Sequence, residues 1–565
     1  MSTLPADYPP PFASSDYVAR PAAGEDERIE VGVLIVGAGP AGLATAVRLG
    51  QLLGEDSELA EQLGEVPVAV AEKGKTAGSH LLSGAVMRPG PIRDLFPDTP
   101  EDQIPHYGVV SGEAVYFMTR RGKVRIPTPP QMKNHGNWVV SVSRLARWMS
   151  EQAEELGAYM LPETDCQRLL VDQGRVRGVV TGDKGRGKDG EELSAFEPGA
   201  ELHAQVTVLA EGTPGHLTQV LRSHFDLDRE STQIWELGVK EVWKVAKPLD
   251  NVIHTLGFPL RLATKYREYG GSWIYPMGDD MVSIGYVVGL DYADATLSAH
   301  DVLQEFKTHP FIRSLLEGGE RVAWGAKTIP GGGFWGLPSR MHVPGAVMVG
   351  DSAGFVDMAA LKGVNYAIRS GMLAAEAIYE ALKAGKATTP AGLWGYTTRV
   401  RESEIWRDLW KVRNIRPAFQ KGYVYGGMIH GMATASFGRM PRKRVRFKPD
   451  VREPVFIGSR ASRYPKPDGE YIFDKLSSVF ASGNQTRDDQ PSHIRIRTQV
   501  PRELAVAWEW MCPAKVYEIA DQEPQNGMVT VHVNPSNCVQ CGAITAKGGR
   551  LTPPEGGSGP EYTIT

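Results

Sequence analysis

The chain has 565 residues, of which 42% are hydrophobic and 23% are charged, so it is long enough to form several packed globular domains. Its formal net charge of −4 argues against nucleic acid as a general partner. The four cysteines are too few and too clustered for a disulfide framework, and they favour metal ligation in a reducing compartment.

The first 30 residues are predicted to be a disordered lead-in. They are rich in prolines, acids and small residues, and they lack the basic start and apolar run of a secretory signal. The long uncharged stretch at residues 31–47 is shorter than a membrane span, and its glycines belong to a nucleotide motif. We therefore expect no transmembrane helix.

A dinucleotide-binding motif opens the folded part of the chain. Residues 31–36 form an apolar run typical of a buried parallel strand, and Gly37, Gly39 and Gly42 follow it ahead of a helical pattern. The first glycine of such a motif permits a tight turn, the second lets the backbone approach a pyrophosphate, and the third lets helix and strand pack closely. The alternative is a glycine-rich turn without a ligand.

A second strand supports the dinucleotide interpretation. Residues 66–71 form an apolar run that ends in Glu72, and a carboxylate at this strand end can bind ribose hydroxyls. The spacing from Gly42 is longer than usual because residues 54–65 form an acidic insert.

Two later segments favour FAD over a dissociable nicotinamide. Glu211 and Gly212 follow one strand-like run, and Gly350, Asp351 and Gly354 follow another. Several nucleotide-facing elements spread along one chain are typical of a bound flavin. Asp351 is placed to bind the ribityl chain, while the next helix directs its N-terminus at the flavin. The alternative role for Asp351 is a helix N-cap.

The middle of the chain predicts a sheet-based substrate domain. Residues 105–140 and 236–325 interrupt the nucleotide fold and contain strand-like runs. We expect the flavin at the boundary of this domain. The Gly270-Gly271 pair within it is, on its own, most typical of a turn.

An apolar segment followed by a basic run suggests contact with an anionic membrane surface. Residues 419–440 are rich in apolar side chains and glycine, and the basic residues that follow are not interrupted by an acid. The alternative is a buried segment followed by an exposed linker. The basic residues are Arg439, Arg442, Lys443, Arg444, Arg446 and Lys448.

Three cysteines near the C-terminus suggest a ferredoxin-like iron–sulfur module. Cys512 precedes a proline, and Cys538 and Cys541 form a Cys-x-x-Cys pair. A further cysteine is expected at position 544, where the chain has Ile544. Zinc is a weaker alternative, because His532 is the only histidine near the three thiols.

In combination these motifs resemble the electron-transfer flavoprotein–ubiquinone oxidoreductase family over nearly the whole chain after residue 30. No single run is decisive, but their order and spacing are specific. The matching runs are Gly78-Ser-His80-Leu-Leu-Ser83-Gly84-Ala, Asn134-His135-Gly136-Asn137, Ala210-Glu211-Gly212 through Gly215-His216-Leu217, Gly270-Gly271-Ser272, Val288-Gly289-Leu290-Asp291-Tyr292, Leu316-Glu-Gly-Gly319, Cys512-Pro-Ala and Pro554-Glu-Gly-Gly-Ser-Gly-Pro560.

The resemblance implies three sites. It implies a quinone ring beside Gly270 and Gly271, and a [4Fe–4S] cluster on the three C-terminal cysteines. It implies FAD in the dinucleotide half, with further contacts at Ser83, Gly84, Arg144 and Gly363.

The chain departs from the family pattern at Ile544, because isoleucine cannot bind iron. Three thiolates leave three alternatives: a [3Fe–4S] cluster, a [4Fe–4S] cluster with an external fourth ligand, or a lost cluster with vestigial cysteines.

The predicted fold is α/β, with a Rossmann-like FAD-binding domain, an inserted sheet-based quinone-binding domain and a C-terminal ferredoxin-like module. The expected divisions are a lead-in (1–30), a discontinuous FAD-binding domain (31–104, 141–235 and 326–418), a quinone-binding domain (105–140 and 236–325), a membrane-surface segment (419–448) and an iron–sulfur domain (449–565).

The predicted function is electron transfer from a reduced electron-transfer flavoprotein, through the cluster and FAD, to ubiquinone or menaquinone. No catalytic acid or base is required, since positioned cofactors carry the electrons. We expect a peripheral, monotopic enzyme on the cytoplasmic face of a bacterial inner membrane. The alternatives are a geranylgeranyl-reductase-like flavoprotein that reduces isoprenoid double bonds, and a non-catalytic interaction protein with the same fold.

Overall fold

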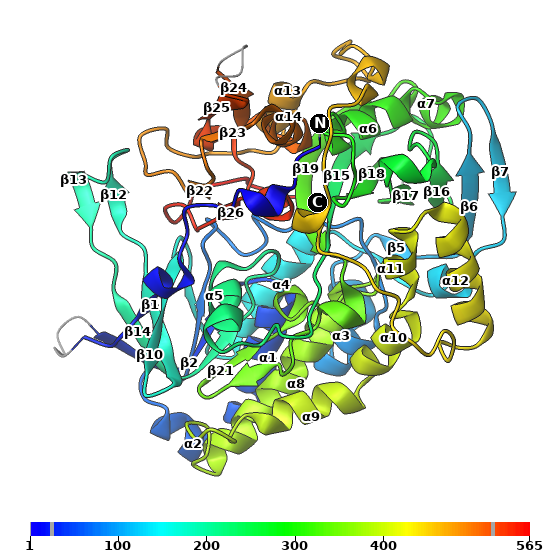
Figure 1. The fold of residues 1–565 in the computed structure, drawn as a ribbon. Helices are drawn as coiled ribbons and strands as arrows, with labels where there is room; N and C mark the ends of the chain where they lie inside the picture. The colour runs from blue at the N-terminus through cyan, green and yellow to red at the C-terminus, as the bar shows by residue number, and fades with distance from the viewer. Residues whose placement is uncertain (1, 23–27, 279, 521–525) are drawn as a thin grey trace.

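The computed structural model describes residues 2–22, 28–278, 280–520 and 526–565. A nine-stranded sheet carries the nucleotide motif, and a seven-stranded sheet lies beside it (Figure 1). A C-terminal module of short strands and helices packs against the seven-stranded sheet. Three short strands, β4 (Val86–Met87), β5 (Gly108–Val109) and β8 (Trp138–Val139), form a separate small sheet.

The nine-stranded sheet is built around β2, which pairs in parallel with β14 on one side and β3 on the other. Every residue of β3 is buried, as expected for a central parallel strand. The helices α1 (Pro40–Gly54), α4 (Val142–Glu155) and α8 (Val364–Lys383) pack with this sheet. Its strands are β1 (Val18–Ala19), β2 (Arg28–Val36), β3 (Val68–Ala71), β9 (Tyr159–Leu161), β10 (Cys166–Asp172), β11 (Arg175–Thr181), β14 (Glu201–Leu209), β20 (His342–Val343) and β21 (Ala346–Met348).

The N-terminal segment corrects the prediction of a disordered lead-in over residues 1–30. β1 pairs in parallel with β10, and Thr3 forms a β-bridge with Val455. β2 begins at Arg28, before the expected start at residue 31. The segment is ordered by pairing with strands that are distant in the sequence, and its local sequence pattern does not predict this pairing. Residues 1 and 23–27 lie outside the described residues.

The seven-stranded sheet joins two distant parts of the chain, because β6 pairs in parallel with β16. β15 begins at Trp235 and β19 ends at Pro330, so the sheet extends past the expected bounds of 236 and 325. Its strands are β6 (Glu113–Met118), β7 (Lys123–Ile126), β15 (Trp235–Lys244), β16 (Val252–Gly257), β17 (Gly270–Pro276), β18 (Met281–Gly289) and β19 (Glu320–Pro330), with α6 (Ala299–Lys307) and α7 (Pro310–Leu316) packed against them.

The C-terminal module docks on β19, the edge strand of the seven-stranded sheet. The backbone N–H of Thr328 donates to the carbonyl of Cys541, and that of Ala326 donates to the hydroxyl of Tyr562. The exposed edge is thereby covered within the chain. The module contains α13 (Lys475–Phe480), β22 (Ile494–Arg495), β23 (Gln499–Pro501), α14 (Arg502–Met511), β24 (Tyr517–Ile519), β25 (Met528–Val533) and β26 (Arg550–Leu551).

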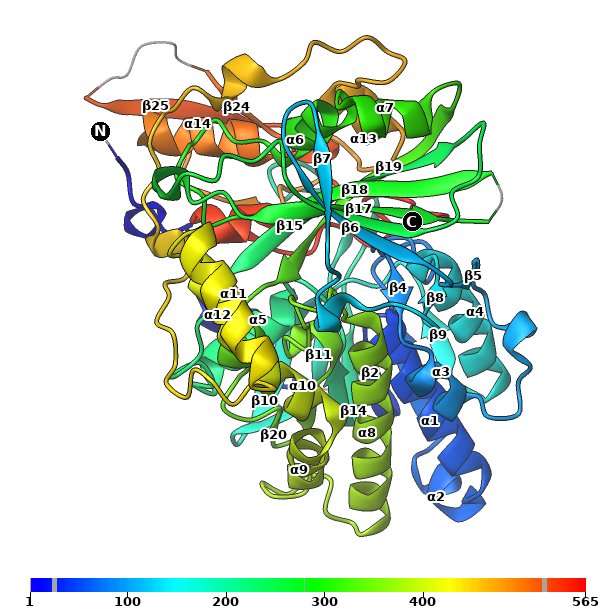
Figure 2. The same ribbon diagram turned by 90° about the vertical axis from the view of Figure 1, so that its right-hand side faces the viewer.

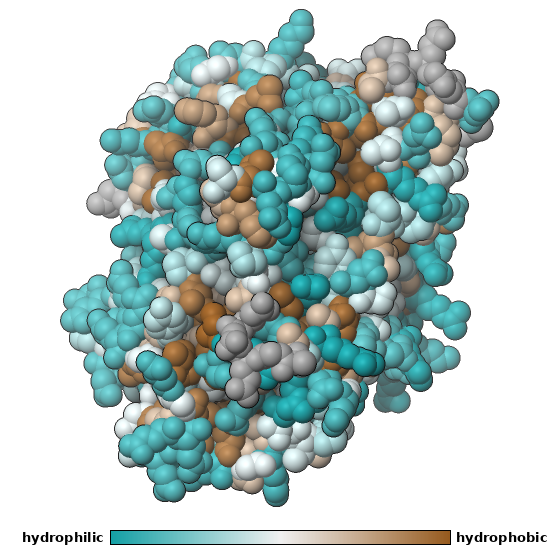
Figure 3. Space-filling view, turned by 90° about the vertical axis from the view of Figure 1, so that its left-hand side faces the viewer, coloured by the Kyte–Doolittle hydropathy of each residue, from teal (hydrophilic) through white to brown (hydrophobic). Residues whose placement is uncertain are grey.

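The helices α11 (Ile415–Phe419) and α12 (Tyr423–Ala435) lie on the same side of the molecule as β6 and β7, which Figure 2 turns toward the viewer. The opposite side carries mainly hydrophilic side chains with scattered hydrophobic ones (Figure 3). Among the described residues, every helix is too short or too polar to cross a bilayer. The remaining helices and strands are α2 (Ser57–Gln62), α3 (Gly90–Leu95), α5 (His216–His224), α9 (Trp394–Glu402), α10 (Glu404–Val412), β12 (Lys184–Arg186) and β13 (Glu192–Glu197).

Candidate functional site

A cavity of about 660 Å³ receives side chains from both large sheets and from the C-terminal module. It contains most of the residues predicted from the sequence, so residues far apart in the chain share one space. The predicted residues that line it are Gly37, Gly39, Glu72, Ser83, Gly84, Glu211, Gly212, Gly270, Gly271, Asp351 and Gly363. Gly42, Arg144, Gly350 and Gly354 do not line it.

The glycine loop after β2 is shaped by close backbone packing. Gly37 has a φ of +108°, and a Cβ there would lie 2.5 Å from the carbonyl oxygen of Ala210. A Cβ at Gly42 would lie 2.1 Å from the carbonyl oxygen of Gly37, so helix and loop pack without room for a side chain. At Gly39 the nearest atom, from Leu81, is 3.7 Å away. A side chain at Gly39 would therefore enter the cavity at the N-terminus of α1, where a phosphate group fits.

Glu72, directly after β3, holds the glycine loop in place through hydrogen bonds. Its carboxylate accepts hydrogen bonds from the backbone N–H groups of Ala38, at 2.9 Å, and Gly74, at 2.7 Å. The side chain lines the cavity, so the same carboxylate orders the glycine loop and faces the space that a ribose would occupy.

Glu211 lines the cavity, and its carboxylate also binds the first turn of α5. Its carboxylate accepts hydrogen bonds from the backbone N–H groups of Leu217, at 3.0 Å, and Thr218, at 2.7 Å, and from the Thr218 hydroxyl at 2.8 Å. The side chain thus stabilises the first turn of α5, where free N–H groups and the helix dipole favour a negative charge. A Glu-Gly pair at the end of a strand suits both a nucleotide site and the N-terminus of a following helix.

Asp351 and Gly363 mark the other end of the predicted flavin region. Burial raises the pKa of the Asp351 carboxyl to about 6, although Lys327 opposes the shift. The alternative role of Asp351 as a helix N-cap is not observed, because Gly363 occupies the N-cap position of α8 and caps it without a side chain. The N-terminus of α8 therefore lacks a side-chain cap, and its residues Gly363 and Val364 line the cavity.

Arg144 lies apart from the cavity. Its side chain is exposed on α4 and donates a 3.3 Å hydrogen bond to the Tyr107 hydroxyl. Several cavity residues were not predicted, among them the three lysines Lys73, Lys327 and Lys362. Lysine carries no local motif, so only the fold could place these side chains.

His80 is a further residue that lines the cavity. Its Nδ1 is buried, and none of the described residues forms a hydrogen bond with it. Burial, followed by the charges of Lys73 and Lys327, lowers the pKa of His80, so the ring is neutral at physiological pH. His80 lies inside one of the family-like runs, but no separate motif indicates its role. An unpaired polar atom here suits a bound polar ring system.

The Gly270-Gly271 pair lies inside β17 and does not form a turn. A Cβ at Gly270 would lie 2.0 Å from the carbonyl oxygen of Val287, and one at Gly271 would lie 2.8 Å from that of Thr255. The glycines thus permit close strand pairing, and their backbone also lines the cavity.

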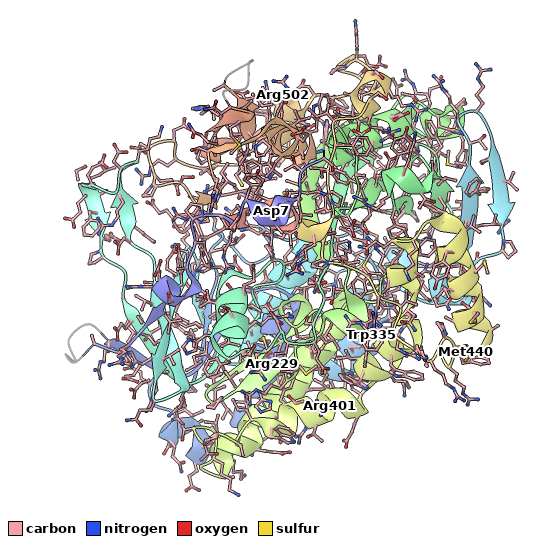
Figure 4. The ribbon with its side chains drawn as sticks, in the orientation of Figure 1. Asp7, Arg229, Trp335, Arg401, Met440 and Arg502 are labelled. Carbon is pink, nitrogen blue, oxygen red and sulfur yellow. The ribbon has the colours of Figure 1, made fainter. Side chains whose placement is uncertain are left out.

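The helix α12 forms one side of the cavity near the pair. Tyr423, Gly427 and His430 line the cavity, while Val424 and Met428, on another face of the helix, are 81% and 64% exposed. Positions three and four apart share a helical face, so one short helix borders both the cavity and the outside. Met440, beyond the end of α12, also lies at the outer boundary of the molecule (Figure 4).

The three C-terminal cysteines are buried in a common core with unpaired thiols. The N–H of Val516 donates to the Cys512 sulfur at 3.4 Å, and the N–H of Gln540 donates to the Cys538 sulfur at the same distance. Burial raises the pKa of all three thiols, and neighbouring thiols raise those of Cys538 and Cys541 further.

This environment fits a cluster better than a single ion. Backbone N–H donors on the sulfurs stabilise thiolates, which are the ligands of iron–sulfur clusters. Within the described residues, no group of three or more His, Cys, Asp and Glu side chains could hold a metal ion. In a cluster each thiolate binds a different iron, so the thiols need not converge on one point. Ile544 is buried, and it supplies no ligand.

Two family models match the chain. The first, described as ETF-QO, ubiquinone-binding, matches residues 235–329, and the second, described as electron transfer flavoprotein-ubiquinone oxidoreductase, 4Fe-4S, matches residues 469–563. Mitochondrial electron transfer flavoprotein-ubiquinone oxidoreductases are similar over nearly the full length. The rice protein is 37% identical over 98% of this chain and 96% of its own, and the human protein is 38% identical over 94% and 89%.

Solved structures share the fold. A geranylgeranyl bacteriochlorophyll reductase-like protein from Thermoplasma acidophilum superposes with a TM-score of 0.54 at 16% identity, covering 74% of this chain and 93% of that one. A flavin-dependent brominase gives 0.50 at 18% identity, with 73% and 94% covered. At these identities the likeness concerns architecture alone. It confirms the predicted α/β fold, and the second family model confirms the iron–sulfur module.

Proposed function

This chain belongs to the electron transfer flavoprotein–ubiquinone oxidoreductase family, and we propose from that membership how its own residues serve the reaction. The enzyme is an oxidoreductase that transfers electrons from reduced electron transfer flavoprotein to a membrane quinone, with FAD and an iron–sulfur cluster as cofactors.

The shared cavity carries the proposal. The glycine loop of Gly37 and Gly39, the Gly270-Gly271 strand and Gln540 of the Cys-x-x-Cys loop all line it. A flavin held there would adjoin both the quinone region and the cluster module. FAD exchanges electrons singly or in pairs and a cluster exchanges them singly, so together they connect a protein donor to a two-electron acceptor.

We assign FAD binding to the glycine loop, Glu72, Ser83, Gly84, Asp351 and Gly363. Gly39 leaves space for the pyrophosphate, Glu72 faces the ribose, and the open N-terminus of α8 faces the flavin ring. Glu211 and Gly42 act indirectly, because each shapes an element next to the cavity. We assign cluster ligation to Cys512, Cys538 and Cys541.

We propose that the quinone enters between α12 and β17. Gly270 and Gly271 present backbone to a flat ring, and Tyr423 and His430 of α12 line the cavity beside them. The Tyr423 hydroxyl donates a 3.4 Å hydrogen bond to the Gly270 carbonyl, so α12 and β17 meet at this point. The apolar outer face of α12 would rest in the membrane, so a lipid-soluble quinone could reach the cavity without crossing water.

The membrane orientation follows from the same segment. Val424, Met428 and Phe437 are exposed apolar side chains, and the basic run lies directly after them. Apolar side chains that enter the bilayer next to a positively charged run suit a monotopic enzyme on an anionic membrane surface. We propose the cytoplasmic face of a bacterial inner membrane as that surface.

The isoprenoid-reductase alternative fits less well. The geranylgeranyl bacteriochlorophyll reductase-like structure has a similar architecture. In this chain, however, residues of a cysteine-bearing C-terminal module line the cavity, which suits an electron relay. The non-catalytic alternative is excluded by the family membership.

Anaerobic stopped-flow measurement tests the proposal. Reduced electron transfer flavoprotein, mixed with the purified enzyme and a short-chain ubiquinone analogue, should be oxidised only when the enzyme is present. Flavin and iron content of the same preparation give the cofactor stoichiometry. Purified enzyme that contains both cofactors and still leaves the donor reduced would contradict the assignment.

A further inference from the structure

Lys327 lies at the junction of the flavin cavity and the cluster loop. Its side chain lines the cavity, and its ammonium group donates a 3.1 Å hydrogen bond to the carbonyl oxygen of Gln540, between Cys538 and Cys541. The next residue, Thr328, donates to the carbonyl of Cys541. One short stretch of β19 therefore contacts both cofactor regions.

The backbone of Gln540 adopts an unfavourable conformation, which the hydrogen bond from Lys327 helps to stabilise. Its φ of +51° is in the left-handed region that residues other than glycine rarely adopt. This conformation accompanies the N–H bond from Gln540 to the Cys538 sulfur. The side-chain oxygen of Gln540 accepts a hydrogen bond from Lys73, and its amide nitrogen donates to the carbonyl of Ser558. Two buried lysines thus hold the loop that presents the cysteines.

Several ionisable groups surround the buried Lys327 side chain. Lys73, Glu72, Cys538 and Cys541 all act on it electrostatically. The Asp351 carboxyl, at the flavin end of the cavity, also interacts with it electrostatically. A lysine side chain ordinarily carries a positive charge, and the hydrogen bond to Gln540 places that charge beside the cysteine loop in a low-dielectric setting.

We propose that Lys327 is a redox-tuning residue shared by the flavin and the iron–sulfur cluster. Each electron that arrives adds one negative charge to either cofactor, and a buried cation between them stabilises both reduced forms. The lysine thereby raises both midpoint potentials and favours acceptance of electrons. This inference rests on the proposed function, because it requires that both cofactors be bound.

The test is a redox titration of three purified holoenzyme variants. Lys327→Gln keeps a hydrogen-bond donor for Gln540 but removes the charge, whereas Lys327→Arg keeps both. For Lys327→Gln we expect each one-electron equilibrium to shift toward the oxidised form by about tenfold, or about 59 mV. Lys327→Arg should keep both midpoint potentials near their wild-type values. The flavin midpoint is followed by absorbance and the cluster midpoint by electron paramagnetic resonance.

Lys362 supplies a matched control. It is a buried cavity lysine whose ammonium donates to the Asn134 side chain at 2.8 Å, and within the described parts of the chain it forms no hydrogen bond with the cysteine loop. Lys362→Gln should leave the cluster midpoint unchanged. Wild-type potentials in Lys327→Gln, or an equal cluster shift in Lys362→Gln, would overturn the inference about Lys327. Wild-type enzyme without FAD or iron would instead contradict the proposed function.

Discussion

The hydroxyl of Thr328 donates a 2.7 Å hydrogen bond to the carbonyl oxygen of Cys541. This bond joins the edge strand of the seven-stranded sheet to a residue of the cysteine loop. The backbone N–H of Thr328 bonds to the same oxygen, so the loop is positioned by the strand that borders the flavin cavity. The position of the cysteine loop relative to the cavity is therefore set by a strand edge and does not depend on a flexible linker.

Two glycines of α12 allow a test of quinone entry. A side chain at Gly427 or Gly431 would meet open space, but only Gly427 lines the cavity. Gly427→Leu should narrow the entrance and lower kcat/KM for a ubiquinone analogue about tenfold or more. Gly431→Leu is the matched control, with the same gain in helix propensity, and should retain wild-type kinetics. Equal kinetics for the two variants would contradict entry beside α12.

Flavin binding is tested at Gly39. This residue has a φ of −87°, which any residue can adopt, and a Cβ there would point into free space. Gly39→Val should therefore fold but yield colourless protein, because the side chain occupies the phosphate position. Flavin absorbance measures the loss of cofactor, and thermal unfolding shows whether the variant is still folded. Gly54→Val, at the far end of α1 with no atom nearby, should remain yellow.

The sequence predicts those parts of the site that depend on local geometry. Gly37 and Gly42 were recognisable because a tight turn and a close helix contact require glycine within a few residues. Glu211 was predicted as a residue of the cofactor site, and it lines the cavity, but its hydrogen bonds to the first turn of α5 were not predicted. The contact between Lys327 and Gln540 joins residues far apart in the chain, and neither belongs to a recognisable motif. Such contacts arise only from tertiary packing.

Membrane binding should depend on particular basic residues. Arg442 and Lys443 are exposed, whereas Arg444 donates to the carbonyl of Glu230 and the hydroxyl of Thr232. Replacing Arg442 and Lys443 with Gln should weaken binding to anionic vesicles by roughly 2 kcal/mol, since each surface charge contributes about 1 kcal/mol. Vesicle sedimentation at low and high salt measures the effect, which salt should suppress.

Arg444→Gln is the control for this experiment. Its guanidinium is held against the protein, with Trp335 4.9 Å away, so its loss should change vesicle binding little. If none of the three basic positions contributes, the basic run is an exposed linker without a membrane role. If Arg444 contributes as much as Arg442 and Lys443, its contacts with the protein do not withdraw its charge from the vesicle surface.

A buried carboxyl predicts a pH-dependent stability. Burial raises the pKa of Asp165 to about 6, although it accepts hydrogen bonds from the Gln167 side chain and the Gly556 N–H. Because the folded pKa exceeds the unfolded value, ionisation of Asp165 destabilises the fold, and its contribution falls as pH rises through about 6. Asp165→Asn should therefore gain roughly 2 kcal/mol relative to wild type between about pH 4.5 and 8. Urea unfolding at several pH values measures this, and a difference that does not vary with pH would contradict it.

The incomplete cysteine set predicts an unusual cluster. Ile544 packs against Gly549, whose Cβ position would lie 2.4 Å from the Ile544 side chain, so an apolar contact replaces the fourth thiolate. With three thiolates, one corner of the cluster should be labile, and mild oxidation should favour a three-iron form. Electron paramagnetic resonance detects this, because an oxidised [3Fe–4S] cluster is paramagnetic whereas a [4Fe–4S]²⁺ cluster is silent. Ile544→Cys should remove the oxidised signal and raise the iron content, while Ile544→Ala, which opens the same space without a thiol, should not. A wild-type enzyme with four irons and no signal after mild oxidation would show that another ligand completes the site.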